Sequence, residues 1–210
     1  MSVKIALAGN PNSGKTTLFN ALTGSNQYVG NWPGVTVEKK EGKLKSKKVK
    51  EEVVVTDLPG IYSLSPYTLE EVVSRDYLLK ENPDVIVDLV DATNIERNLY
   101  LTTQLIETGV PVVIALNMVD LLEKRGIKID VARLSMLLDC PIVETSALKG
   151  EGLDKLIDEA IKTAKKKEAD LPKEIFNKDL EDAVSAAAEV LPSSIDANKK
   201  RWYAVKFLEK

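Results

Sequence analysis

The sequence lacks histidine, and it has one cysteine, Cys140. The first absence excludes enzymes whose nucleophile is activated by a histidine base, and it excludes zinc sites built on imidazole. The single cysteine excludes intrachain disulfides and cysteine-rich metal centres, which indicates a reducing, intracellular compartment. A metal ion bound by this chain is therefore expected to be a hard cation with oxygen ligands, such as magnesium.

Long hydrophobic runs and a strong charge imbalance are also missing. No apolar run approaches the roughly 18 residues that a membrane-spanning helix needs, and the apolar start before Gly9 is too short for a signal peptide. The chain is therefore expected to be soluble as it stands. With 29 basic and 32 acidic residues the net charge is −3, which argues against a nucleic-acid footprint over the whole domain.

What the sequence does contain is an alternation of short apolar runs and amphipathic segments. Such Val/Ile/Leu runs are typical of strands buried on both faces of a parallel sheet. The expected strands are Val3–Ala8, Glu52–Thr56, Val85–Val90, Val110–Leu116 and Pro141–Glu144. The expected helices are Gly14–Leu22, Leu69–Lys80, Ile95–Thr108, Asp130–Leu138 and Leu153–Lys167. The alternation predicts an α/β domain of three layers with a mostly parallel sheet.

Two stretches differ from this alternation. Residues 39–50 contain seven lysines, and we expect Glu38–Lys43 and Leu44–Val49 to form an exposed hairpin at the sheet edge, where lysines deter edge-to-edge association. A contact with anionic lipid or RNA is the alternative. After a polar break that ends in Pro172, two short helices are expected over Asp179–Leu191 and Asn198–Lys210. The predicted organisation is a domain over residues 1–168 and a small helical domain over residues 169–210.

The strongest motif is a glycine-rich loop that follows the first expected strand. It fits the pattern G-x-x-x-x-G-K-[ST] and opens a helix, a context in which backbone N–H groups and the helix N-terminus hold phosphate oxygens. We expect Lys15 to reach the β- and γ-phosphates and the hydroxyl of Thr16 to ligate magnesium. The residues expected to bind phosphate are Gly9, Asn10, Pro11, Asn12, Ser13, Gly14, Lys15, Thr16 and Thr17.

Two further motifs predict that the base is guanine. Asn117 and Asp120 fit N-x-x-D at the end of an expected strand, and a carboxylate there accepts from both N1–H and the exocyclic amine of guanine, which adenine cannot match. Met118 stands where most GTPases have lysine, so we expect weak GTP affinity and fast GDP release. The S-A-x box, which supports the base through a backbone N–H, is expected at Ser146, Ala147 and Leu148.

Two loops are expected to sense the γ-phosphate. Asp57 and Gly60 form D-x-x-G after an expected strand, where Asp57 holds magnesium through water and the N–H of Gly60 contacts the γ-phosphate. Thr36 is the expected switch threonine that completes the magnesium shell. The residues expected to bind nucleotide in that loop are Gly34, Val35 and Thr36.

Along the chain the motifs occur in the order phosphate loop, Thr36, D-x-x-G, N-x-x-D and S-A-x. In this order they resemble the motifs of GTPases with the Ras-like fold, over about residues 3–167. Ile61 stands where many GTPases carry the glutamine that orients the attacking water, so catalysis is expected to depend on other groups. The resemblance to GTPases with a similar phosphate loop implies that Asn12 is a potassium ligand, and that potassium supplies positive charge to the transition state. The expected catalytic residues are Lys15, Asn12, Thr36 and Gly60.

Three stretches, residues 9–24, 29–38 and 57–64, resemble the cytoplasmic N-terminal GTPase portion of FeoB-type ferrous iron transporters. Residues 201–209 are similar to the end of that family's helical domain, which is described as inhibiting nucleotide dissociation. The resemblance implies that GTP hydrolysis regulates iron(II) uptake by a membrane domain absent from this chain, at the cytoplasmic face of the cell membrane. It also implies small accessory iron-transport proteins as partners and leaves a homo-oligomer open.

Two alternatives stay open on the residues alone. The first is a cytosolic GTPase that acts in ribosome assembly or tRNA modification, because such proteins also lack the glutamine; the lysine-rich stretch is then an RNA contact. The second is a nucleotide-dependent docking module with negligible turnover, because Ile61 cannot orient water. No iron site is predicted, since the chain has no histidine and no cysteine cluster. No nucleic-acid partner is expected, since residues 170–210 are acidic to neutral rather than basic.

Overall fold

The computed structural model describes residues 2–24, 27–46, 49–166 and 176–209. Its centre is a seven-stranded sheet in the order β2-β3-β4-β1-β5-β6-β7. The strands β4, β1, β5, β6 and β7 are parallel, whereas β2 and β3 pair antiparallel. The strands are β1 (Val3–Gly9), β2 (Gln27–Asn31), β3 (Glu38–Lys43), β4 (Val53–Asp57), β5 (Val85–Asp91), β6 (Val112–Asn117) and β7 (Ile142–Thr145).

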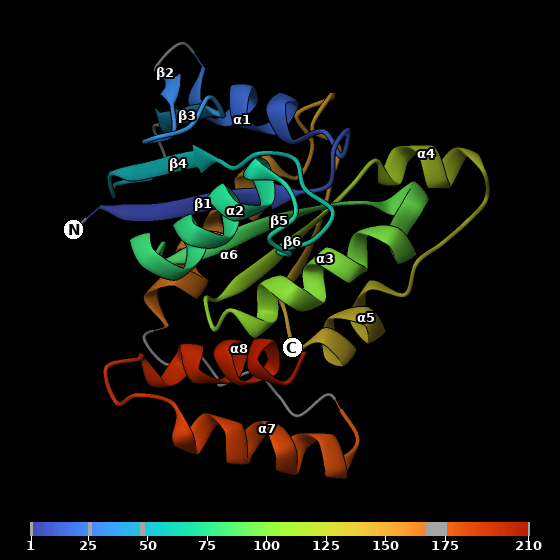
Figure 1. The fold of residues 1–210 in the computed structure, drawn as a ribbon. Coiled ribbons are helices and arrows are strands. Elements are labelled where there is room, and N and C mark those ends of the chain that lie inside the picture. The colour runs from blue at the N-terminus through green and yellow to red at the C-terminus, as the bar shows by residue number, and fades with distance from the viewer. Residues whose placement is uncertain (1, 25–26, 47–48, 167–175, 210) are drawn as a thin grey trace.

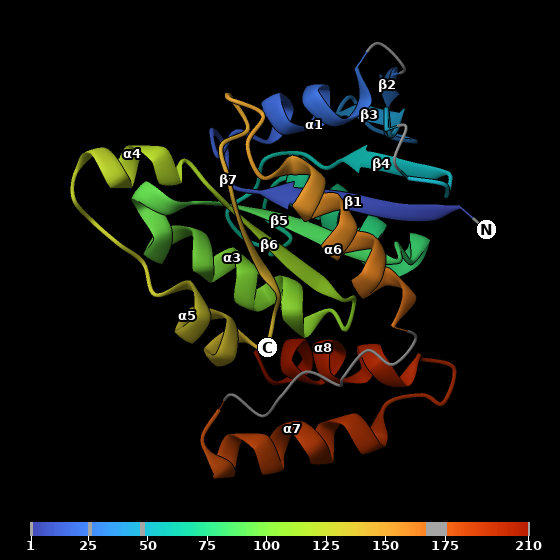
Figure 2. The ribbon, with the colours of Figure 1, turned by 180° about the vertical axis from the view of Figure 1, so that it is seen from behind.

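Helices cover both faces of this sheet, as Figure 1 and Figure 2 show. On one face, α1 and α6 enclose an apolar core with β1, β5 and β6; on the other, α2, α3 and a π-helical turn enclose a second core. The predicted three-layer α/β fold with a mostly parallel sheet is thereby confirmed. The helices are α1 (Lys15–Thr23), α2 (Leu69–Asp76), the π-helix Tyr77–Glu81, the 3₁₀ turn Ala92–Asn94, α3 (Ile95–Glu107), α4 (Val119–Lys124), α5 (Val131–Leu138), α6 (Leu153–Lys165), α7 (Lys178–Val190) and α8 (Ala197–Leu208).

The predicted lysine-rich hairpin was wrong in its second strand. β3 has the expected bounds, but it pairs with β2 on one side and with β4 on the other, so β2 forms the edge of the sheet. The described residues of the segment 44–49 form no strand. The N–H of Leu44 still donates to the carbonyl of Val53 in β4 at 2.9 Å, but the N–H of Lys45 donates to the carbonyl of Leu22 in α1 at 2.8 Å. Leu44 and Val49 pack against the core beneath α1 and α6, which favours this path over a second hairpin strand.

The helical pair α7 and α8 forms its own small core and also packs on the sheet domain. Val184 and Ala187 of α7 contact Ala204 of α8, while Trp202 of α8 is 2% exposed and belongs to the main core. The predicted boundary at residue 168 lies outside the described residues. Within the described part of the chain, no helix is both long enough and apolar enough to cross a bilayer.

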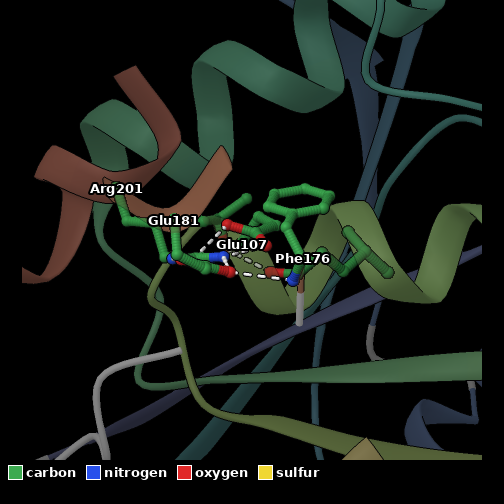
Figure 3. A network of polar contacts seen from close by, with 6 residues as sticks. Glu107, Phe176, Glu181 and Arg201 are labelled. Atoms are coloured by element: carbon green, nitrogen blue, oxygen red, sulfur yellow. Dashed lines mark hydrogen bonds and ion pairs between the residues drawn. The ribbon is translucent and has the colours of Figure 1, made fainter. Parts of the chain in front are cut away.

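A buried polar network fixes this pair to α3 (Figure 3). Arg201 of α8 donates from Nε to Glu107 Oε2 at 2.9 Å, at the end of α3, and from Nη1 to Glu181 Oε2 of α7 at 2.6 Å. The backbone N–H of Phe176 donates to Glu181 Oε1 at 2.8 Å, and the guanidinium of Arg201 lies over the Phe176 ring at 5.5 Å. One arginine therefore ties three helices together.

Candidate functional site

The predicted motifs lie where parallel strands end. β1 ends at Gly9, β4 at Asp57, β6 at Asn117 and β7 at Thr145, and each strand is followed by a loop that carries one of the motifs. The carboxyl ends of parallel strands meet at one edge of the sheet, which is where ligands bind in open α/β folds. The topology therefore brings segments that are far apart in the sequence to one edge.

The glycine-rich loop lines an open pocket of about 580 Å³ at this edge. Gly14 has φ +96°, and a Cβ there would lie 2.5 Å from Asn117 Nδ2, so only glycine fits. Gly60 approaches the same loop, since its Cβ would lie 3.2 Å from Pro11 Cα. The pocket is lined by Asn10, Pro11, Asn12, Gly14, Lys15, Thr16, Thr17, Gly60 and Met118.

Several polar atoms of this loop are buried without a partner. Asn10 is 3% exposed and Ser13 is 1% exposed, yet the side-chain oxygen and nitrogen of Asn10 and the hydroxyl of Ser13 make no hydrogen bond. Leaving such groups unsatisfied is costly, so native structures rarely do it. The loop therefore has the character of a binding site whose hydrogen bonds are completed by a ligand.

The charges of the pocket are already paired. Lys15 Nζ donates to Asp57 Oδ1 at 2.8 Å, and both side chains are buried. Thr16, whose side chain carries a hydroxyl, lines the same pocket. A carboxylate and a hydroxyl are the hard oxygen donors that magnesium takes from proteins when phosphates and water supply its other ligands, so these residues fit that ion. In the described part of the chain, no group of three or more His, Cys, Asp or Glu side chains is placed to hold a metal.

Asn117 connects the loops that surround the base-reading motif. Its Nδ2 donates to the carbonyl of Ser13 at 2.8 Å, and its Oδ1 accepts from the N–H of Ala147 at 3.0 Å. Asn117 is 3% exposed, so its role is to hold the phosphate loop and the S-A-x loop at a fixed separation. Met118 follows with φ +65°, the left-handed conformation, and α4 begins directly after it.

Asp120, the predicted base-reading carboxylate, lies in the first turn of α4 and already has a partner. Lys149 Nζ lies 3.0 Å from Asp120 Oδ2. Lys149, together with a hydrogen bond from the hydroxyl of Ser146, lowers the pKa of Asp120 below its usual range. Sequence reasoning missed Lys149; its position directly after the S-A-x box was the available signal.

Other predicted residues lie away from the pocket. Gly34, Val35 and Thr36 are not among the lining residues, and Thr36 and Leu148 are exposed. The loop that carries Thr36 is anchored instead through Trp32, which is 8% exposed. The Trp32 ring packs edge-on against the Tyr77 ring, with 5.3 Å between the ring centroids.

Ile61 is 3% exposed in the core beneath α2 and α3. Its side chain is therefore held away from the pocket, and Gly60 is the member of that loop that lines it.

Taken together, the sheet order, the glycine-rich loop before α1 and the loops after β4, β6 and β7 define a P-loop nucleotide-binding protein of the α/β class. Residues 3–160 match the family model described as "Ferrous iron transport protein B". The chain belongs to this family.

Its relatives and the solved structures agree with this assignment. The Fe(2+) transporter FeoB of Escherichia coli K12 is 44% identical over 212 residues, which cover 98% of this chain and 26% of the relative. The FeoB of Salmonella typhimurium LT2 is 51% identical over 156 residues, which cover 72% of this chain and 20% of the relative. The chain thus spans about a quarter of the length of these relatives.

Two solved structures of NFeoB from S. thermophilus are similar to the whole chain. A mutant bound to mGDP has a TM-score of 0.93 and 55% identity, and the match covers 100% of this chain and 79% of that one. The mGMPPNP-bound protein has a TM-score of 0.85 and 55% identity, and the match covers 99% of this chain and 77% of that one. The predicted P-loop GTPase fold is confirmed by this similarity.

Proposed function

We propose that this chain is the GTP-binding and GTP-hydrolysing part of a ferrous iron transporter, in which the GTP cycle regulates iron(II) uptake. The observation that carries the proposal is the pocket formed by the glycine-rich loop, with its unpartnered Asn10 and Ser13 atoms and with Asn117 holding the S-A-x loop beside it. Relatives named as Fe(2+) transporters, and NFeoB structures described as bound to mGDP or mGMPPNP, support it.

In this proposal the backbone N–H groups of residues 9–17 and the N-terminus of α1 bind the phosphates, and Lys15 neutralises their charge. Magnesium, held by Thr16 and Asp57, would supply further positive charge. Thr36 would complete that ion's shell and the N–H of Gly60 would contact the γ-phosphate, so release of phosphate would free both loops. Asp120 accepts from N1–H and the exocyclic amine of guanine, beside Ser146, Ala147 and Leu148.

Hydrolysis needs a group that replaces the glutamine, because Ile61 is buried away from the pocket. Asn12 is the candidate: it has φ +66°, it is exposed, and it lines the pocket. We place potassium on its side-chain oxygen, where the cation would stabilise the charge that spreads over the phosphates in the transition state.

At the level of the whole protein, we propose a domain of residues 1–168, a helical domain of residues 169–210, and a membrane domain outside this chain. The chain would lie at the cytoplasmic face of the cell membrane, with small accessory iron-transport proteins as further partners. In the lysine-rich stretch of residues 39–50, Lys39 pairs with Glu41 and Lys40 pairs with Glu38. These ion pairs favour a solvated strand over an RNA contact.

The test is binding and multiple-turnover hydrolysis of GTP by the purified chain in potassium and in sodium buffer. We expect faster turnover in potassium, and no difference between the two ions for Asn12→Ala. Asp120→Asn should move the preference from guanine to xanthine nucleotides, because the base contact inverts. Equal GTP binding by Asp120→Asn and the unchanged protein would exclude Asp120 as the residue that reads the base. If GTP were bound but not hydrolysed in either buffer, the chain would be a nucleotide-dependent docking module rather than a GTPase.

A further inference from the structure

The loop that follows β7 is rigidly built. Ser146 and Glu151 exchange two backbone hydrogen bonds of 3.1 Å, and the N–H of Lys149 donates to the carbonyl of Ser146 at 3.1 Å. Gly152 closes the loop with φ +77°, and a Cβ there would lie 2.3 Å from the carbonyl oxygen of Glu144, so only glycine fits. The backbone of Lys149 therefore has a fixed position beside the predicted base-reading motif.

The side chain of Lys149 uses this position to reach across to α4. Its Nζ lies 3.0 Å from Asp120 Oδ2, and the side chains are 46% and 18% exposed. The pairing lowers the pKa of Asp120 and raises the pKa of Lys149, so both groups are charged at neutral pH. The carboxylate that guanine is proposed to use is thus already engaged by a cation of the same chain.

We propose that Lys149 competes with guanine for Asp120 and thereby sets how tightly and how long the nucleotide is held. The inference rests on the proposed function, in which Asp120 reads the base. Guanine needs both carboxylate oxygens for its two N–H donors, and the strength of that contact comes from the negative charge. An ammonium at 3.0 Å from Oδ2 takes one acceptor direction of that oxygen and offsets part of the carboxylate's charge.

The competition works in both directions. When the base enters, Asp120 gives up or weakens its contact with Lys149; when the base leaves, Lys149 recaptures the carboxylate and favours release. An exposed ion pair is weak, so we expect the effect of Lys149 on nucleotide affinity to be about two- to fivefold. The effect should also shrink as salt screens the pair.

The experiment measures fluorescent GDP binding and release for the unchanged chain and for Lys149→Met, in about 50 mM and about 500 mM salt. We expect Lys149→Met to bind GDP about two to five times more tightly and to release it more slowly by a similar factor at the lower salt. The difference should narrow at the higher salt. Lys128→Met is the matched control, because it removes one exposed positive charge that lies beyond the end of α4.

A second comparison isolates the carboxylate. In the Asp120→Asn background, measured with xanthosine diphosphate, the added Lys149→Met change should have no effect, because the charged partner is gone. Unchanged or weaker GDP binding by Lys149→Met would overturn the inference and would make Lys149 a residue that positions Asp120 or covers the base. Failure of the unchanged chain to bind GDP or GTP would instead overturn the proposed function itself.

Discussion

At the scale of single residues, the protein keeps a carboxyl group, Asp88, in the apolar layer between β5 and α3. Asp88 is 1% exposed, and the hydroxyl of Thr102 donates to its Oδ2 at 2.6 Å. Burial raises the pKa of Asp88 to about 7, because a charge is poorly solvated there. One hydroxyl offsets only part of that penalty, so this carboxyl makes the stability of the fold depend on pH.

The sign of the pH dependence follows from the pKa of Asp88 in the folded protein and in the unfolded chain. The folded protein holds a proton that the unfolded chain releases above its ordinary pKa of 3.8, so the contribution of Asp88 is full below about pH 4 and is lost as pH rises to about 7. Asp88→Asn keeps a neutral partner for Thr102. The advantage of the unchanged protein over Asp88→Asn in unfolding free energy should therefore fall by on the order of 4 kcal/mol over this range.

Urea unfolding followed by circular dichroism at a series of pH values measures this difference. Asp182→Asn, the same change at an exposed position of α7, is the control. Its free energy of unfolding should change with pH in the same way as that of the unchanged protein. If the free energy of unfolding of Asp88→Asn also followed that of the unchanged protein, Asp88 would not titrate between about pH 4 and pH 7.

At the scale of elements, the structure shows which parts of the fold the sequence could predict. The parallel strands β1, β4, β5 and β6 are short, mostly apolar runs, and their signal is local. In contrast, β2 is glycine-containing and mostly exposed, so it forms through pairing with β3 rather than through its own pattern. Helix α4 has six residues and starts after a left-handed Met118 without a side-chain cap, so no pattern marks its beginning.

The same distinction applies to the candidate site. The phosphate loop is a motif that is contiguous in sequence, and most of its residues line the pocket. The contacts of Asn117 with Ser13 and Ala147, in contrast, join segments that are far apart in the sequence. The position of the Thr36 loop depends on Trp32 packing against Tyr77, which is a contact between distant segments. The pairing of Lys149 with Asp120 likewise depends on how two loops meet. Such contacts carry no periodicity and cannot be predicted from one sequence.

Also at the scale of elements, Arg201 is one of several contacts that attach α7 and α8 to the sheet domain. The others include buried Trp202 and a hydrogen bond of 2.6 Å from Lys199 Nζ to the carbonyl of Leu79. The Arg201 side chain is 13% exposed and faces Glu107 and Glu181, which are 8% and 6% exposed. Removing it takes away the cation that two buried carboxylates share, so Arg201→Ala should lower the free energy of unfolding by roughly 3 kcal/mol. Urea unfolding measures this loss.

Two further variants test whether the loss of stability in Arg201→Ala comes from the buried charges. Lys206→Ala removes a cation of α8 whose partner, Glu209, is half-exposed, and it should cost less than about 1 kcal/mol. Replacing the whole network, with Glu107→Gln, Glu181→Gln and Arg201→Met together, should recover much of the loss because no buried charge is left unpaired. If Arg201→Ala cost no more than Lys206→Ala, the network would contribute little to attaching the helices.

At the scale of the whole molecule, α3 connects the nucleotide pocket to the helical pair. The N–H of Leu64, in the segment that follows Gly60, donates to Gln104 Oε1 at 2.6 Å. One turn further along α3, Glu107 binds Arg201 of α8. A packed helix moves as a unit, so a displacement of the segment after Gly60 can be transmitted through α3 to α7 and α8.

This arrangement predicts that Gln104 and Arg201 act on nucleotide release together. If the helical pair slows dissociation, as the family resemblance implies, Arg201→Met should speed release of fluorescent GDP. Gln104→Ala removes the contact with Leu64, so adding Arg201→Met to it should speed release much less. The two changes should therefore be non-additive by about 0.5–2 kcal/mol in the release barrier, whereas changes at unconnected sites add. Tyr100→Ala, at an exposed position of α3, is the control that should combine additively with Arg201→Met. Additive effects for Gln104 as well would show that α3 does not transmit the change, and that the helical pair acts on the pocket by another route.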